Sequence, residues 1–274
     1  MTNHQSLANK PIGVFDSGAG GLTVVSQIFR HLPSEQVIYF GDMGRTPYGI
    51  RSAEVIKSFS RQNVNFLLEQ DVKFIVVACN SASALALDYI LQIFNIPMMG
   101  VIEPGSRAAA SGTKNGRIGV IGTEATIGSL SYTKALLKID PKLEVFSMAC
   151  PLFVSLAENG YIGKKAAYLI AEDYLGYLKE KKIDTLVLGC THYPPLKGVI
   201  GKVMGDDVRL IDSAEETAKT IGQMLAELNL ANSNPAAGAH KFYVSDTPEK
   251  LKEISKYFVE SPVEEVARID INSY

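Results

Sequence analysis

Two of the three cysteines in this 274-residue chain stand in matching sequence surroundings. Cys79 closes the apolar run of "FIVVACNSASAL" (74–85), and Cys190 closes that of "LVLGCTHYPPL" (186–196), 111 residues further on (190 minus 79). Polar residues able to form hydrogen bonds follow each cysteine directly. Thiols exchange protons close to neutral pH, so this pair could supply a general acid and a general base.

Each of these cysteines is expected at the carboxyl end of a strand and just before a helix. Ligands of open α/β sheets bind beyond such strand ends, and a helix N-terminus lowers the pKa of a thiol from about 8.5. The alternative is a small buried apolar side chain, since free cysteine is among the most buried residue types. The equivalent placement of two cysteines favours a chemical role, whereas Cys150, followed by Pro151, is interpreted as structural.

A zinc site built from Cys79, Cys190 and His192 is a further alternative. Cys-x-His is not a usual chelating spacing, however, and no fourth ligand stands out in the sequence. A redox pair would normally show Cys-x-x-Cys, which the sequence lacks. No pyridoxal-phosphate signature is visible either, so we expect neither a metal nor a cofactor.

The elements that must position the cysteines are short β-rich runs that alternate with helical patterns. This alternation predicts an α/β fold with mainly parallel sheets. A capping box at Ser213 and Glu216 predicts the start of one helix, Thr247-Pro248 predicts the start of the last one, and 229–240 is expected to be a surface loop. The predicted strands are 12–15, 37–40, 74–77, 98–102, 118–121, 144–148, 185–188, 208–211 and 242–244.

A weak internal repeat relates the two halves of the chain. "IGVFDS" begins at Ile12 and "IGVIGT" begins at Ile118, an offset of 106 (118 minus 12) that is close to the offset between the cysteines. The repeat predicts two similar α/β lobes, related by an approximate twofold axis, with a cleft between them. We place the second lobe at 101–212. The first lobe combines 1–100 with 213–274, because the C-terminal segment alone would bury too little surface to fold.

Two loops could complete the cleft. "FDSGAGGLTV" follows a strand but lacks the Gly-Lys-Ser/Thr of a phosphate loop. It either presents Asp16 and Ser17 to a ligand or uses Asp16 as a simple helix cap. "GDMGRTPYGIRS" is either a plain surface turn or a segment whose Tyr48 and Gly49 close over a small ligand, since loops carry many ligand contacts.

Composition and charge exclude several classes of protein. With 46% hydrophobic and 20% charged residues, the chain is typical of a globular protein rather than a disordered one. A formal net charge of −2 gives no basic footprint for nucleic acid, and the scattered lysines form no membrane-surface patch. "MTNHQSLANK" has no apolar signal core, and no apolar run reaches the roughly 18–20 residues of a membrane span, so we expect a cytoplasmic protein.

Taken together, these segments resemble the glutamate racemase family, whose members interconvert L- and D-glutamate without a cofactor. The resemblance runs from about residue 11 to about residue 250 through "GVFDSGAGGLTV", "YFGDMGRTPYGIRS", "VVACNSASA", "VIGTEATIGSLSY", "CPLFVSLAENG" and "LVLGCTHYPPL". It implies two α/β lobes with the active site between them, a small-molecule substrate and a homodimer. It also implies a role in supplying D-glutamate for peptidoglycan precursors.

The resemblance further implies roles for individual residues. Cys79 and Cys190 would be the catalytic thiols, and Asp16, Glu158 and His192 would assist them. Substrate contacts would come from Asp16, Ser17, Tyr48, Gly49, Asn80, Ser81, Thr123, Thr126, Thr191 and His192. One departure is visible, because the family often has threonine where this chain has Ser81, but the hydroxyl group is kept.

Two thiols suit the inversion of a carbon centre. A proton must leave one face of the α-carbon and another must reach the opposite face, so two acid–base groups avoid moving a single base around the substrate. The resemblance assigns Cys190 as the base toward L-glutamate and Cys79 as the base toward D-glutamate. A related racemase acting on aspartate is one alternative. A non-catalytic two-lobe binding protein is another, disfavoured because binding does not require paired thiols.

Overall fold

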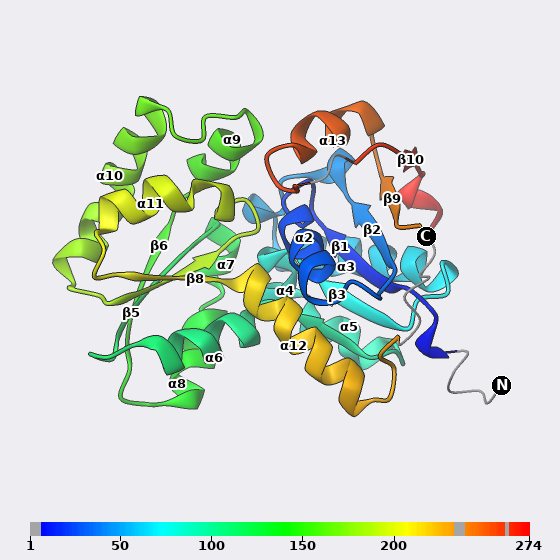
Figure 1. Ribbon diagram of the computed structural model, residues 1–274, viewed down its shortest axis with the longest axis horizontal. Helices are drawn as coiled ribbons and strands as arrows, with labels where there is room; N and C mark the ends of the chain where they lie inside the picture. Colours follow the sequence, from blue (N-terminus) through cyan, green and yellow to red (C-terminus); the bar gives the residue numbers. More distant parts are fainter. Residues whose placement is uncertain (1–6, 233–238, 261–262) are drawn as a thin grey trace.

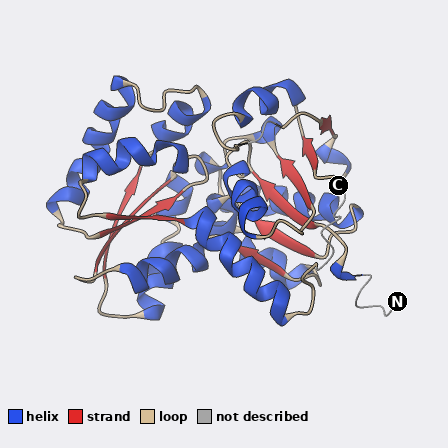
Figure 2. Cartoon of the chain, viewed as in Figure 1, coloured by secondary structure: helices blue, strands red, loops and turns tan. Residues whose placement is uncertain are grey.

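The protein is seen in a computed structural model that describes residues 7–232, 239–260 and 263–274. Two β-sheets lie side by side, and helices cover both of them (Figures 1 and 2). All strand pairs of the described residues are parallel. The structure therefore confirms the predicted α/β fold with mainly parallel sheets.

The first sheet has six strands in the order β10-β9-β2-β1-β3-β4. β1, β2 and β3 are buried along their whole length, as expected for parallel strands that are covered on both faces. The strands are Ile12–Asp16 (β1), Val37–Gly41 (β2), Phe74–Val77 (β3), Met98–Gly100 (β4), Lys241–Val244 (β9) and Val266–Arg268 (β10).

The second sheet has four strands in the order β6-β5-β7-β8. This order repeats that of β2-β1-β3-β4 in the first sheet, so the two sheets share one connectivity. The strands are Arg117–Gly122 (β5), Glu144–Ala149 (β6), Thr185–Gly189 (β7) and Arg209–Asp212 (β8). The exact lobe boundaries at 100/101 and 212/213 stay a prediction.

The helices pack on the faces of the two sheets. One long helix, α12 (Ser213–Glu227), packs against both α2 and α6 and so runs along the junction of the two halves (Figure 1). The other helices are α2 (Leu22–His31), α3 (Ala53–Glu69), α4 (Asn80–Leu85), α5 (Leu87–Ile93), α6 (Ile102–Gly112), α7 (Glu124–Gly128), α8 (Ser131–Ile139), α9 (Leu152–Glu158), α10 (Lys165–Glu180), α11 (Lys197–Met204) and α13 (Pro248–Ser255). Short 3-10 helices are η1 (Met43–Arg45), η2 (Tyr48–Ile50), η3 (Pro194–Leu196) and η4 (Ile271–Ser273).

Several predicted element boundaries were wrong. The strand predicted at 98–102 stops at Gly100, because Ile102 already begins α6. The capping box is absent: the N-cap of α12 is Asp212, whose carboxylate accepts a hydrogen bond from the Ala214 N–H, while Ser213 donates its hydroxyl to the Leu188 carbonyl. β10 was not predicted, since its three residues form no apolar run. Of the loop expected at 229–240, residues 233–238 lie outside the described residues.

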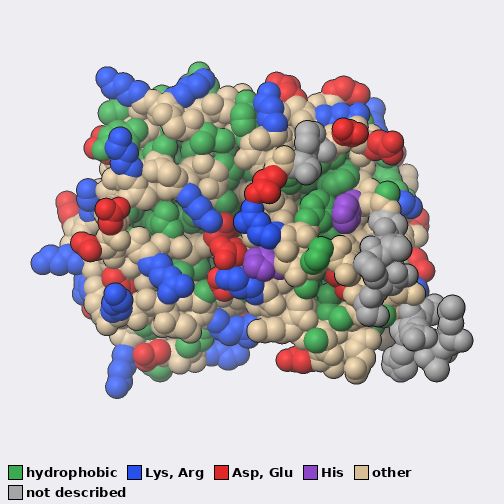
Figure 3. Space-filling model, viewed as in Figure 1, with side chains coloured by type: hydrophobic (Ala, Val, Ile, Leu, Met, Phe, Trp, Pro, Cys, Tyr) green, Lys and Arg blue, Asp and Glu red, His purple; other side chains and the backbone are tan. Residues whose placement is uncertain are grey.

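Thr247 is the N-cap of α13, and Pro248 is its first residue, as the sequence predicted. Within the described ranges, no helix combines the length and apolar character that crossing a bilayer requires. On the face drawn in Figure 3, acidic and basic side chains are interspersed, and no broad surface of one sign is visible.

Candidate active site

Both cysteines line one cavity between the two halves of the molecule. The cavity measures about 20 Å³ and lies beyond the carboxyl ends of β1, β3, β5 and β7. Eight of the ten predicted substrate-binding residues line it, and Asp16 and Thr126 do not. The lining residues are Ser17, Thr46, Pro47, Tyr48, Gly49, Cys79, Asn80, Ser81, Thr123, Val154, Cys190, Thr191 and His192.

Cys79 is the N-cap residue of α4 and lies two residues beyond the end of β3, close to the strand end that the sequence predicted. Burial, together with the nearby charge of Asp16, raises the pKa of its thiol to about 12, although hydrogen bonds from the Ala82 backbone and the Ser17 side chain oppose the rise. The expected lowering of this pKa by the helix N-terminus was therefore wrong. α4 has only six residues, and the loss of water around the sulfur outweighs its dipole.

Cys190 follows β7, but no helix begins directly after it. The chain instead makes a turn in which the Tyr193 N–H donates to the Cys190 carbonyl, and η3 and α11 begin only at Pro194 and Lys197. The prediction of a helix N-terminus at this thiol was wrong. Its neighbour is a histidine, because Nδ1 of His192 lies 3.8 Å from the Cys190 Sγ.

The buried His192 and the half-buried Glu158 form a pair beside Cys190. Nε2 of His192 lies 2.9 Å from Oε1 of Glu158, the last residue of α9. Burial by itself lowers the pKa of His192, but hydrogen bonds to Cys190 and Glu158 outweigh it and raise the pKa to about 10. Burial raises the pKa of Glu158, yet the hydrogen bond and charge of His192, helped by Lys250, leave it lowered. A cation next to the Cys190 sulfur is the result.

Asp16 ends β1 and is completely buried behind the cavity. It is not a helix cap, because α2 begins at Leu22 with Gly21 as the N-cap. Its carboxylate accepts hydrogen bonds from the Gly18 N–H at 2.9 Å and the Thr191 hydroxyl at 3.2 Å. Burial raises the pKa of Asp16, although the charge of His192 opposes the rise. Asp16 thus connects the first half of the site to the second through Thr191.

Asn80 carries an unused hydrogen-bond donor at the cavity. Its Oδ1 accepts a hydrogen bond of 2.7 Å from the Tyr132 hydroxyl, which comes from α8 in the other half. Its Nδ2 is buried and has no hydrogen-bond partner among the described residues. A buried donor without a partner is costly, so this amide is suited to binding an anionic group of a ligand.

Three hydroxyl groups meet across the cleft. Ser81 and Thr123 are 2.9 Å apart through their side-chain oxygens, and the Thr123 hydroxyl donates to Thr126 at 3.0 Å. Ser81 comes from α4, whereas Thr123 and Thr126 stand at the start of α7. Thr126 is buried and does not line the cavity, so it supports the cluster rather than facing the opening.

Tyr48 lines the cavity, but its hydroxyl is directed elsewhere. It donates to the Asp42 carboxylate and accepts from the Asn63 amide. Asp42 is completely buried and also pairs with Arg45 at 2.7 Å and with the Ser245 hydroxyl at 2.7 Å. This network anchors the turn that carries Tyr48 and Gly49, and it excludes the interpretation of a plain surface turn.

Some residues of the site were not found by sequence reasoning. Thr46 and Pro47 line the cavity and adjoin the predicted Tyr48, so their place in the same turn could have found them. Val154 lies in the ordinary apolar pattern of α9, which carries no signal. The described part of the chain also contains no group of three or more His, Cys, Asp or Glu residues arranged to hold a metal ion.

Comparison with known proteins identifies the family. A family model described as Asp/Glu/Hydantoin racemase matches residues 12–221. The chain belongs to this family. A glutamate racemase of Geobacter metallireducens is 48% identical over 264 residues, which cover 96% of this chain and 98% of that protein.

Solved structures of the same family superpose closely on the chain. The glutamate racemase isoform RacE1 of Bacillus anthracis gives a TM-score of 0.92 at 41% identity and covers 96% of this chain and 98% of its own. The glutamate racemase of Francisella tularensis, solved in complex with D-glutamate, gives 0.91 at 40% identity and covers 97% of this chain and 100% of its own.

Proposed function

We propose that the chain is a glutamate racemase that inverts the α-carbon with two thiols, Cys79 and Cys190. The observation that carries the proposal is that both cysteines line one cavity, each from a different sheet. The relatives named above support glutamate as the substrate, because they are glutamate racemases and match this chain over nearly their full length. No electron-withdrawing cofactor takes part in this mechanism.

The two thiols enter the reaction in different states. Cys79, whose pKa is raised to about 12, enters as a thiol and is ready to donate a proton. Cys190 lies beside the protonated imidazole of His192, whose positive charge stabilises a negative sulfur at 3.8 Å. With the assignment that the family resemblance implies, Cys190 then removes the α-proton of L-glutamate while Cys79 protonates the opposite face. The reverse reaction exchanges these roles, so each turnover leaves the pair ready for the other enantiomer.

The remaining lining groups bind the substrate and stabilise developing charge. The Asn80 Nδ2 donor and the hydroxyls of Ser81 and Thr123 are placed to bind carboxylate oxygens. Asp16 orients Thr191 by accepting a hydrogen bond from its hydroxyl. The buried charge of Asp16 also helps to keep Cys79 protonated. Donors fixed before the reaction stabilise the carbanion more effectively than water, because they need no reorganisation.

The cavity must widen before glutamate can bind. A cavity of about 20 Å³ holds roughly one water molecule, whereas small-molecule sites commonly measure about 300–1,000 Å³. The substrate must therefore enter while the cleft is wider, and the cleft then closes around it.

Circular dichroism of the purified protein tests the proposed function directly. With L-glutamate and no added cofactor, we expect the optical signal to decay to zero as the racemic mixture forms. L-aspartate serves as the comparison, since an aspartate racemase would share the fold and the two thiols. Decay with aspartate and none with glutamate would refute the substrate, and no decay with either would favour a binding protein.

Three finer properties belong to the same proposal. The protein acts in the cytoplasm, where thiols remain reduced, and its D-glutamate supplies peptidoglycan precursors. It assembles as a homodimer, as the family resemblance implies. Sedimentation velocity at micromolar concentration checks the assembly, with about twice the 29.7 kDa mass of one chain expected and the single-chain mass contradicting it.

A further inference from the structure

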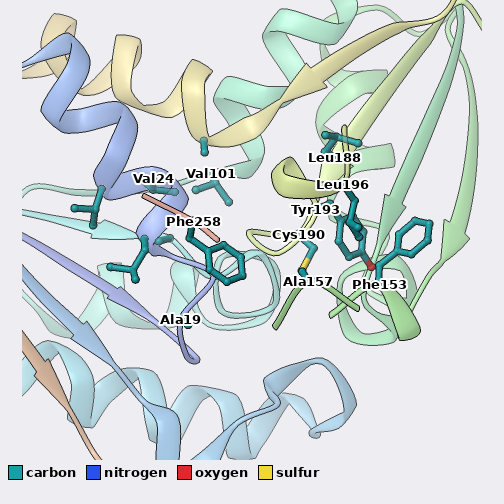
Figure 4. Packing of buried hydrophobic residues seen from close by; sticks show 14 of the residues in the cluster. Ala19, Val24, Val101, Phe153, Ala157, Leu188, Cys190, Tyr193, Leu196 and Phe258 are labelled. Atoms are coloured by element: carbon teal, nitrogen blue, oxygen red, sulfur yellow. The ribbon is translucent and has the colours of Figure 1, made fainter. Parts of the chain in front are cut away.

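His192 has an aromatic neighbour that does not line the cavity. The ring of Phe258 lies 5.5 Å from the imidazole, centroid to centroid, and the two planes meet at 85°. Phe258 is 6% exposed, so this contact is shielded from water. Figure 4 shows Phe258 between Ala19 and Val24 on one side and Cys190 and Ala157 on the other.

Phe258 reaches the site from the opposite half of the molecule. It follows α13, which is connected to β9 of the first sheet, whereas His192 follows β7 of the second sheet. Backbone hydrogen bonds hold the segment in a turn, with the Phe258 N–H donating to the Ser255 carbonyl at 2.8 Å. The preceding Tyr257 lies against Gly160, two residues beyond Glu158, because a Cβ there would stand 2.3 Å from its hydroxyl oxygen.

A second residue of the first half also meets the imidazole. A Cβ on Gly20 would lie only 2.5 Å from Nδ1 of His192 and 2.4 Å from Oγ1 of Thr191. Gly20 therefore allows the loop after β1 to approach the histidine directly. The His192 imidazole, which belongs to the second half of the molecule, is thus flanked by two residues of the first half, Gly20 and Phe258.

The hydrogen bonds of His192 do not fix its ring plane by themselves. Rotation about the bond between Cβ and the imidazole has broad minima, so a ring held at one nitrogen can still tilt. Glu158 holds Nε2 at 2.9 Å, but the contact of Nδ1 with the sulfur of Cys190 is long, at 3.8 Å. Perpendicular packing against a buried aromatic ring restricts such a tilt, because aromatic pairs prefer this geometry.

On the basis of the proposed two-thiol racemisation, we propose that Phe258 is a positioning residue, which fixes the His192 imidazole so that Nδ1 faces the Cys190 sulfur. Phe258 acts through His192 and takes no part in proton transfer itself. Its influence is confined to one half of the site, because Cys79 has no histidine of its own. The loss of Phe258 should therefore slow proton transfer at Cys190 and leave proton transfer at Cys79 unchanged.

Isotope effects with α-deuterated substrates separate the two transfers. In Phe258→Leu we expect kcat to fall about tenfold while KM stays within about twofold, as for a small misplacement of a catalytic group. The substrate isotope effect on kcat/KM should grow for L-glutamate, whose deuteron Cys190 removes. It should shrink for D-glutamate, because slow reprotonation by Cys190 then masks the removal of deuterium by Cys79.

Three comparison variants make the test decisive. His192→Gln should move both isotope effects in the same direction as Phe258→Leu, since both act through Cys190. Phe258→Tyr keeps the ring and should retain wild-type values, because Phe258 borders a cavity of about 300 Å³ that has room for a hydroxyl. Phe66→Leu changes another buried phenylalanine, which lies on α3 and packs edge-on against Tyr243 of β9, and it should change stability without changing either isotope effect.

A parallel change of the two isotope effects in Phe258→Leu, or no change in either, would overturn the positioning role. So would an equal effect in Phe66→Leu, which would show a general consequence of loosened packing. Failure of the proposed function looks different, because the wild-type protein itself would then not racemise glutamate. Thermal unfolding of each variant confirms that the folded protein is what is compared.

Discussion

The two halves of the candidate site share a backbone plan and differ in their side chains. Cys79 and Cys190 each follow the third strand of a sheet with the same connectivity, yet Cys79 caps a helix and Cys190 lies in a turn. Behind Cys79 lies the carboxylate of Asp16, and beside Cys190 lies the imidazole of His192.

This difference shows how a repeated fold can support two unlike chemical groups. The common strand order brings two thiols to one cavity from opposite sheets, which is what inversion of a carbon centre needs. The charged groups beside the two thiols differ. Burial and a nearby carboxylate keep the proton on Cys79, whereas a cation faces Cys190.

Removal of either thiol should abolish racemisation, because the reaction needs both. In Cys79→Ser and in Cys190→Ser we expect racemisation to fall about 10³-fold or more, because each hydroxyl is a far weaker acid than the thiol it replaces. Circular dichroism with L-glutamate measures the rate. Cys150→Ala is the matched control, since Cys150 is equally buried but lies outside the cavity, and it should stay active. Wild-type rates in either serine variant would refute that thiol's role.

Replacement of His192 should slow proton transfer at Cys190 and leave proton transfer at Cys79 unchanged. In His192→Gln we expect kcat to fall by about 10²-fold, since acid–base assistance is lost while the hydrogen-bonding shape is largely kept. The measurement is kcat for each enantiomer. A fall no greater than twofold would show that the imidazole is a packing group and that the two halves are alike.

Loss of the free donor at Asn80 should appear in binding rather than in proton transfer. A hydrogen bond to a charged group contributes about 1.5–3 kcal/mol, so Asn80→Ala should raise KM for glutamate about 10- to 100-fold. Asn65→Ala is a suitable control, because its amide donates to the Tyr274 carbonyl away from the cavity. An unchanged KM in Asn80→Ala would mean that the buried Nδ2 does not meet the substrate.

The same histidine makes the stability of the protein depend on pH. Its folded-state pKa is raised to about 10 from an ordinary value near 6.5, so the stabilisation is fully present below about pH 6.5 and is lost as the pH rises toward 10. In urea unfolding, the advantage of the wild type over His192→Gln should shrink steadily from pH 6.5 to 8.5. An advantage that grows over this range would contradict a protonated His192.

The smallest effect is expected at Tyr48, where the hydroxyl serves the fold. Tyr48→Phe leaves the buried Asp42 carboxylate without one donor, which should lower the free energy of unfolding by about 1–3 kcal/mol. Because this hydroxyl is directed away from the cavity, KM should stay within about twofold. A large rise in KM with unchanged stability would place the hydroxyl on the substrate instead.

The sequence predicted the features that depend on neighbouring residues and missed those that depend on contacts between distant segments. Local apolar runs were enough to place Cys79 and Cys190 at strand ends, and the repeat of two glycine-valine strands indicated paired lobes. The apolar pattern did not show that a turn leading to Pro194 and Pro195, rather than a helix, follows Cys190.

The supporting contacts could not be predicted, because they join distant segments. Tyr132 meets Asn80 across 52 residues, and Ser245 meets Asp42 across 203. Phe258 lies against His192 although nothing in its own surroundings distinguishes it from an ordinary buried phenylalanine. The pKa of Cys79 was predicted in the wrong direction for the same reason, since burial is a property of the assembled molecule.

The central claim is that two groups, one on each face, handle the α-proton. Incubation of the wild-type protein with L-glutamate in D₂O, sampled before one tenth has reacted, tests it by mass spectrometry of the separated enantiomers. We predict that the D-glutamate formed carries one deuterium at the α-carbon while the remaining L-glutamate carries almost none. Equal deuterium in both enantiomers at this early stage, or unlabelled D-glutamate, would indicate a single base and contradict the account.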